Sequence, residues 1–206
     1  MRRAITLARE LNDTHALAVA LFHAAFLSHF VRHSAEVERL AADLLELATR
    51  QNFALWLTAG EVLLGWARGV SGSTAEGLSR IENGIRGYRA AGSMLNTSWA
   101  LALKAECLHL AVRTPEALAA IEEAETIVES SGERWWQAEL HRLRGVFLTS
   151  MDSDEVQIET SLGEAIRIAK EQKSISLEKR AEETYAEYRR QKASGSGGRG
   201  FRLPLC

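Results

Sequence analysis

The chain has 206 residues, of which 46% are hydrophobic and 25% are charged, a composition typical of a soluble globular protein. Its formal net charge of −2 provides no general attraction to nucleic acid or to an anionic membrane surface, so neither is expected as a partner. No stretch approaches the ~18 uninterrupted apolar residues of a membrane-spanning helix. With only Cys107 and Cys206, a disulfide framework is excluded, and we expect a cytoplasmic protein.

Helical patterns of apolar residues follow one another along the chain and are separated by short turns. Ser34 is predicted to cap one of these helices, and Thr114 another, ahead of Pro115 at a first helical position. Gly92 and Gly132 are predicted to end the helices that precede them. The predicted helices span residues 5–11, 14–31, 35–51, 53–70, 74–91, 95–113, 115–131, 133–149, 152–172 and 176–191.

These helices repeat in pairs. Ala105 is a small residue in a first helix, and a shift of 40 residues backward reaches Gly65 and then Ala25. Forward, the same shift reaches Gly145, and 41 further residues reach Ala186. The second helix of each pair carries an apolar stripe at i, i+4 and i+7, whose copies are Val37, Ala41, Leu44; Gly77, Ile81, Gly84; Ala117, Ile121, Ala124; and Ile158, Leu162, Ala165. The sequence therefore predicts a repeat protein of paired helices.

The predicted array covers residues 1–191 and begins in the middle of a repeat. One further shift backward places the stripe on Met1 and Ala4, so residues 5–11 read as the end of a second helix without its first. We therefore expect the chain to be a piece of a longer array. Residues 192–206 are predicted to be a flexible Gly/Ser-rich tail.

The spacing of Ala105, Ala117, Ile121 and Ala124 resembles the tetratricopeptide repeat, in which a small residue of the first helix faces the stripe of the second. The period here is about six residues longer than the usual one, which helices about a turn longer can explain. The resemblance implies an all-α fold, an α–α superhelix of about five helix pairs with a period near 40 residues.

The stretch from Gly132 to Gly145, with its Trp135-Trp136 pair, is similar to a segment in the C-terminal repeat arrays of large bacterial signalling proteins. Those proteins carry a class III adenylate/guanylate cyclase domain or a helix-turn-helix DNA-binding domain, then an AAA-type ATPase, then the repeats. Residues 1–191 fit the array, and no residues here match the cyclase or ATPase parts. The resemblance implies membership of such a regulator, without implying that this chain has the regulator's activity.

In tetratricopeptide arrays the first helices line a concave groove that holds a peptide or a neighbouring domain. Such a groove would be aromatic in its N-terminal part and charged in its C-terminal part, which suits a segment with one large apolar anchor. The strongest candidates for partner contact are Phe26, Trp66, His109, Glu139 and Arg142. The groove positions in full are Phe22, Phe26, His29, Val62, Trp66, Ala102, Glu106, His109, Glu139, Arg142, Arg180 and Glu183.

Two alternatives remain at this point. Phe22, Phe26 and Trp66 can instead be core between repeats, since aromatic residues at helical spacing usually pack. The array can also be a sensor that binds a small effector inside the superhelix, which requires an enclosed apolar pocket with a few convergent polar groups. The sequence favours a protein or peptide partner, or another domain of a longer parent chain, and does not set the oligomeric state.

No catalytic or metal site is predicted. His29 and His33 stand at i, i+4 with Glu36 beyond, but a zinc site needs three or four ligands in fixed geometry. Cys107 and His109 diverge on a helix, so they do not form a catalytic dyad. We therefore expect a non-catalytic interaction scaffold with no cofactor.

Overall fold

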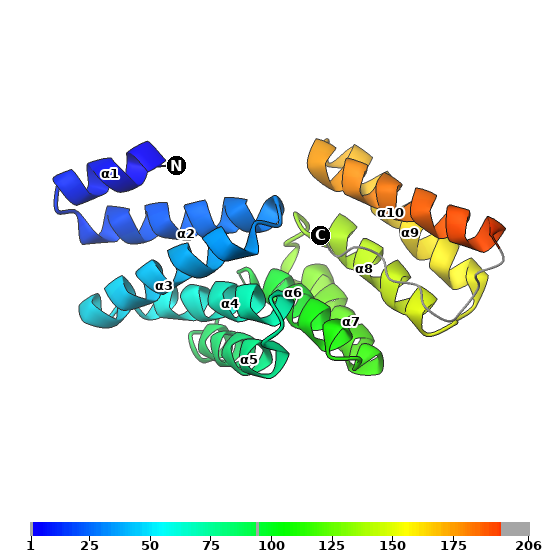
Figure 1. The fold of residues 1–206 in the computed structure, drawn as a ribbon, viewed down its shortest axis with the longest axis horizontal. Coiled ribbons are helices and arrows are strands. Elements are labelled where there is room, and N and C mark those ends of the chain that lie inside the picture. Colours follow the sequence, from blue (N-terminus) through cyan, green and yellow to red (C-terminus); the bar gives the residue numbers. More distant parts are fainter. Residues whose placement is uncertain (1, 94, 195–206) are drawn as a thin grey trace. The chain divides into compact units, whose positions relative to one another are not determined.

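The computed structural model describes residues 2–93 and 95–194, and these residues form ten α-helices and no strand. Short turns join consecutive helices from α1 to α5, and short connections join those from α6 to α10 (Figure 1). The all-α repeat predicted from the sequence is thus confirmed, with a helix at every expected place. The helices are α1 (Arg2–Glu10), α2 (Thr14–Phe30), α3 (Ser34–Gln51), α4 (Ala54–Val70), α5 (Thr74–Ala90), α6 (Thr97–Leu110), α7 (Thr114–Ser131), α8 (Gln137–Ser150), α9 (Glu155–Glu171) and α10 (Ile175–Ala193).

Helices α6, α8 and α9 begin at least two residues later than predicted, α9 at Glu155 instead of residue 152. Residues 95–96 and 133–136 precede α6 and α8 instead of belonging to them. The two segments contact one another, because the Glu133 carboxylate accepts hydrogen bonds from the Asn96 backbone N–H at 2.9 Å and from the Ser98 hydroxyl at 3.2 Å. Glu133 thus supplies a hydrogen-bond acceptor at the start of α6. The local sequence pattern predicts a helical Glu133 because it does not contain this long-range bond.

The predicted N-caps are displaced by one residue. His33 and Arg113 occupy the N-cap positions of α3 and α7 without a side-chain hydrogen bond that caps the helix, and Ser34 and Thr114 are the first helical residues. Thr114 Oγ1 instead lies 3.1 Å from Nδ1 of His109 in the preceding helix. The C-terminal signals are confirmed, since Gly92 and Gly132 both have left-handed φ values of 62° and 73°.

The contacts divide the helices into two compact units, α1 to α5 and α6 to α10. In the first unit, α2 packs on α3 and α4, and α4 packs on α5. In the second unit, α6 packs on α7 and α8, and α8 packs on α9 and α10. The tail residues 195–206, predicted to be flexible, lie outside the described residues. Among the described helices, none is long and apolar enough to cross a membrane.

The small residues at the repeat phase bring paired helices close together. A Cβ atom added to Gly65 of α4 would lie 2.7 Å from the carbonyl oxygen of Gly77 and 2.9 Å from the backbone nitrogen of Ile81, both in α5. Ala25 and Ala105 are fully buried at the equivalent positions. Ala186 differs because it is exposed: no described helix covers that side of α10. The stripe residues Ala41, Leu44, Ile81, Ala117, Ile121, Ala124, Leu162 and Ala165 are completely buried.

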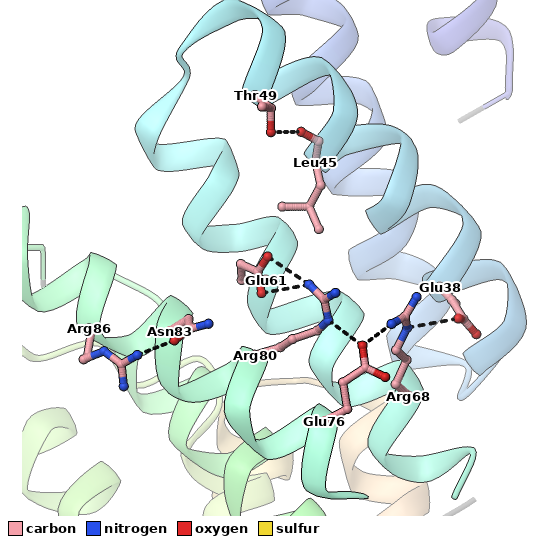
Figure 2. Close-up of polar contacts among 9 residues, drawn as sticks. All are labelled: Glu38, Leu45, Thr49, Glu61, Arg68, Glu76, Arg80, Asn83 and Arg86. Atoms are coloured by element: carbon pink, nitrogen blue, oxygen red, sulfur yellow. Dashed lines mark hydrogen bonds and ion pairs between the residues drawn. The ribbon is translucent and has the colours of Figure 1, made fainter. Parts of the chain in front are cut away.

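A row of ion pairs links the outer sides of α3, α4 and α5. Figure 2 shows Arg68 of α4 between Glu38 of α3 and Glu76 of α5, and Arg80 of α5 between Glu76 and Glu61 of α4. Arg80 Nη1 lies 3.0 Å from Glu61 Oε1, and Arg80 Nε lies 3.1 Å from Glu76 Oε1. These partly exposed pairs orient the helices while the apolar stripes supply most of the packing energy.

Candidate interaction surfaces

The first unit carries a row of aromatic side chains along α2. Phe22, Phe26 and Phe30 follow at i, i+4 and i+8, with ring centroids 5.7 Å and 5.0 Å apart. Trp56 of α4 lies beside the row, 5.5 Å from the Phe22 ring. Phe22 is buried, whereas Phe26, Phe30 and Trp56 are half-buried and keep part of each ring accessible. We call these four residues the aromatic strip.

Buried groups of α2 and α4 hold one end of the aromatic strip in place. His29 packs edge-on against Trp66 with ring centroids 4.5 Å apart, and the Arg32 guanidinium lies 5.7 Å from the Trp66 ring. His29, Trp66 and Val62 are completely buried. A partner would reach these three only after the unit rearranged, so their role in partner binding stays a prediction. Phe22 and Trp66 are buried, as expected from the alternative that these aromatic residues are core between repeats. Phe26 differs because part of its side chain stays accessible.

The second unit brings together three of the predicted charged residues. The Arg142 guanidinium donates to both carboxylate oxygens of Glu139, at 3.0 Å and 2.8 Å, and to Thr184 Oγ1 of α10 at 3.3 Å. Arg180 of α10 adds a second cation, 3.0 Å from the same carboxylate. The Glu139 and Arg142 side chains are each only 1% exposed. This bidentate, buried pair joins α8 to α10, whereas Glu183 projects to solvent with 67% of its side chain exposed.

The remaining predicted groove positions lie on α6. Ala102 and Glu106 are fully buried, and His109 is half-buried. The His109 ring lies 4.9 Å from that of Phe147, and burial lowers the pKa of His109. A histidine in this setting is neutral at pH 7. It packs against α8 while its Nδ1 is held by Thr114.

The sequence groups all these positions in a single groove, but the structure presents them in two separate units. One set lies on α2 and α4, the other on α6, α8 and α10, and each is described by itself. A continuous groove across both units stays a prediction. Sequence reasoning missed Phe30, although it continues the spacing of Phe22 and Phe26. It also missed Trp56. This residue lies on a different face of α4 from the predicted positions Val62 and Trp66, so the repeat phase does not select it, yet its large ring reaches Phe22.

The tryptophan pair precedes α8 instead of lying within the helix predicted over residues 133–149. Trp136 occupies the N-cap position of α8 and Trp135 precedes it, so the two rings are not spread around a helix. Their centroids are 5.2 Å apart, with Trp136 completely buried and Trp135 half-buried. Trp136 thus packs inside the second unit, whereas part of Trp135 stays accessible.

The described residues include one cysteine, Cys107, which is buried in α6. Burial raises the pKa of the Cys107 thiol, which leaves it protonated and unreactive. No group of three or more histidine, cysteine, aspartate or glutamate side chains that could hold a metal ion occurs in residues 2–93 and 95–194.

Comparison with known proteins places the fold. No family model matches the chain. The uncharacterised protein R02095 of Rhizobium meliloti (strain 1021) is 28% identical over 178 residues, which is 85% of this chain but only 17% of that protein's length. The crystal structure of the apo form of RapI has a TM-score of 0.66, 14% sequence identity, and covers 94% of this chain and 76% of its own. At that identity the likeness shows the fold alone: a helical repeat.

Proposed function

We propose that the chain is a non-catalytic interaction module that binds a protein or peptide partner through the aromatic strip of α2 and α4. The observation that carries the proposal is the row of half-buried Phe26 and Phe30 side chains beside Trp56. Aromatic side chains that are rigidly held and partly exposed are the residue type in which binding energy concentrates at protein interfaces.

The chemistry of the strip defines the partner that it would hold. Its accessible surface is apolar, with the exposed His23 beside Phe22 at a ring distance of 5.1 Å. A helix or extended segment with a large apolar anchor would bury the Phe26 and Phe30 rings, and polar groups on its flanks would meet solvent. The buried residues His29 and Trp66 would contribute by fixing the strip, without direct contact.

The proposed wider setting is the regulatory array of a longer bacterial signalling protein, an ATPase or a cyclase, in the cytoplasm. Support comes from the resemblance of the Gly132–Gly145 stretch to such arrays and from the relative of which this chain spans 17%. In that setting the module would sense a partner and restrain or release the output domain. The likeness to RapI supports the helical repeat fold and does not bear on this setting. The setting can be tested separately from partner binding.

Affinity capture from bacterial lysate, followed by identification of the captured proteins, tests the aromatic strip. The Phe26→Ala/Phe30→Ala double variant removes the accessible rings, whereas Leu27→Ala removes an apolar side chain of the same helix that is 51% exposed and off the strip. We expect recovery of a specific partner to fall at least about tenfold with the double variant and to be unchanged with Leu27→Ala. Equal recovery with all three proteins contradicts the proposal. A metabolite that raises the unfolding temperature while no protein is captured favours the small-effector alternative instead.

A further inference from the structure

The aromatic strip ends near a cation at the turn between α2 and α3. The Arg32 guanidinium lies 5.7 Å from the centre of the Trp66 ring. The His29 ring joins Trp66 to Phe30, at centroid distances of 4.5 Å and 6.0 Å. Phe30 and Arg32 are partly exposed, whereas His29 and Trp66 are completely buried. The strip therefore ends in an accessible ring and a guanidinium that the same buried pair supports.

The exposure of this end follows from the repeat and does not depend on where the sequence begins. Shifts of 40, 80 and 120 residues take Phe30 and Arg32 to the later turns that follow a first helix. None of the equivalent residues is buried, although other helices of the chain precede each of them. The turn after a first helix thus stays open inside the array. The equivalents of Phe30 are Val70, Leu110 and Ser150, and those of Arg32 are Gly72, Val112 and Asp152.

The helices that form the strip carry almost no negative charge. Residues 14–35 contain no aspartate or glutamate, and the single carboxylate of α4 belongs to Glu61. Glu61 accepts hydrogen bonds from Arg80 of α5 at 3.0 Å and 3.1 Å. The first carboxylate after the turn, that of Glu36, accepts hydrogen bonds from Arg39 at 2.9 Å and 2.8 Å. The side chains of α2 and its turn are therefore neutral or cationic, and their electrostatic complement is a negative group.

From this juxtaposition we infer that the strip selects protein segments with a carboxylate within one helical turn of their apolar anchor, and that Arg32 recognises this carboxylate. The inference rests on the proposed binding function of the strip. An anchor that covers Phe30 brings the next turn of the segment toward Arg32. Stacking on Trp66 orients the planar guanidinium, and its N–H donors lie in that plane, in the geometry that suits a carboxylate.

Two other kinds of partner fit less well. A cationic segment would be attracted by the aromatic faces but would meet the like charge of Arg32. A long polyanion such as RNA would extend over neighbouring helices, and α3, which packs on α2, has four carboxylates against two arginines. A protein segment with one or two local carboxylates avoids both conflicts.

Fluorescence anisotropy with three labelled peptides and the full chain tests the selection. Each peptide is a capped amphipathic helix with one tryptophan anchor, and the three differ only in two residues within a turn of it, which are glutamates, glutamines or lysines. At low salt we expect the glutamate peptide to bind at least about threefold more tightly than the glutamine peptide, and the lysine peptide to bind least tightly. The preference should disappear in about 0.5 M sodium chloride, because salt screens partly exposed charges.

Substitutions assign the preference to a residue. Arg32→Gln should lower the affinity for the glutamate peptide to that for the glutamine peptide, whose own affinity stays unchanged. Arg32→Lys keeps the charge without the planar fork and should retain part of the preference. Arg50→Gln is the matched control, since it removes the same charge from α3 at a side chain that is 65% exposed. Comparing two peptides on each variant cancels any general effect of the substitution on stability.

The outcomes that overturn the inference are distinct from those that overturn the proposed function. Equal binding of the three peptides, tightest binding of the lysine peptide, or a preference that survives in Arg32→Gln overturns the inference. If Phe26→Ala/Phe30→Ala still weakens binding in these cases, the binding function of the strip stands. If that variant binds every peptide as well as the parent protein does, or if no peptide binds, both fail. A single-stranded RNA that binds more tightly than the glutamate peptide overturns the choice of a protein partner.

Discussion

At the scale of single residues, the Glu139–Arg142 pair shows how burial changes the loss of stability when one member of an ion pair is removed. Both side chains are 1% exposed, and the same carboxylate also pairs with Arg180. Glu164–Arg167 has the same i, i+3 spacing and chain order, but its side chains are 38% and 52% exposed. Removing one member of a buried pair leaves an uncompensated charge in a medium that solvates it poorly, whereas water replaces the lost partner at an exposed site.

We therefore predict that Glu139→Ala lowers the free energy of unfolding by about 3 kcal/mol, because Arg142 loses its bidentate partner inside the protein. Glu164→Ala is expected to lower it by less than about 1 kcal/mol. Urea denaturation followed by circular dichroism measures both. Similar losses for the two variants would show that the inner pair is more hydrated than its geometry indicates.

Two histidines make stability depend on pH. Burial lowers the pKa of His109 and is also the main cause of the lowered pKa of His141. Their pKa values in the unfolded chain are about 6.5. Between the folded and unfolded pKa values the unfolded chain binds more protons, so this contribution to stability is complete above the unfolded pKa and is lost as the pH falls through the folded pKa.

The expected result is a free energy of unfolding that decreases as the pH is lowered from 7 to 5. The His109→Gln/His141→Gln variant should show a shallower decrease over the same interval, because two of the groups that take up protons on unfolding are gone. Denaturation curves at a series of pH values measure this slope. A variant with the slope of the parent protein would assign the dependence to other groups.

At the scale of helices, the closest approach joins α4 and α5. Gly65 lies so near Gly77 and Ile81 that a Cβ atom would meet backbone atoms, which are unable to move without separating the helices. Gly163 in α9 is the useful contrast, since an added Cβ there has no neighbour within 4 Å. Glycine inside a helix is otherwise unfavourable relative to alanine, because it loses more conformational freedom on folding.

The same substitution should thus act in opposite directions at these two sites. We predict that Gly65→Ala destabilises the protein by about 1–3 kcal/mol through overpacking. Gly163→Ala should stabilise it by about 0.5–1 kcal/mol through the helix propensity of alanine. Thermal unfolding of both variants gives the signs, and a stable Gly65→Ala protein would mean that α4 and α5 separate without loss.

At the scale of the whole molecule, the described helices of each unit contact near neighbours in the chain. Pairs such as α4 and α5 or α8 and α9 share large contacts, and within each unit the contacts between described helices join elements no more than two apart. In such arrays the free energy of unfolding is approximately a sum of contributions from each helix pair and from its contacts with neighbouring pairs. A substitution that destabilises one pair therefore has little effect on distant pairs.

Hydrogen exchange should reveal that locality. With Gly65→Ala, amides of α4 and α5 are expected to exchange faster, while those of α8 and α9 keep the protection of the parent protein. Mass spectrometry of exchanged peptides resolves these segments. A uniform loss of protection from α2 to α10 would instead describe one cooperative unit.

The sequence by itself determined the repeat, its period and the helices within a few residues. It could do so because the stripe of Ala117, Ile121 and Ala124, and the small residue at Gly65, encode local packing that each helix pair repeats. The late starts of α6 and α8 were not readable, since Glu133 turns toward Asn96, 37 positions earlier in the chain, and only the folded unit brings the two together.

The candidate site was readable only in part. Phe22 and Phe26 could be selected by phase, but phase says which face a residue occupies, not what lies above it. Tertiary structure decided that Trp66 and Arg142 are buried by neighbouring helices and that Phe26 and Phe30 remain accessible. Exposure depends on which helices are present to cover a face, and that is a property of the assembled helices, absent from any one stretch of sequence.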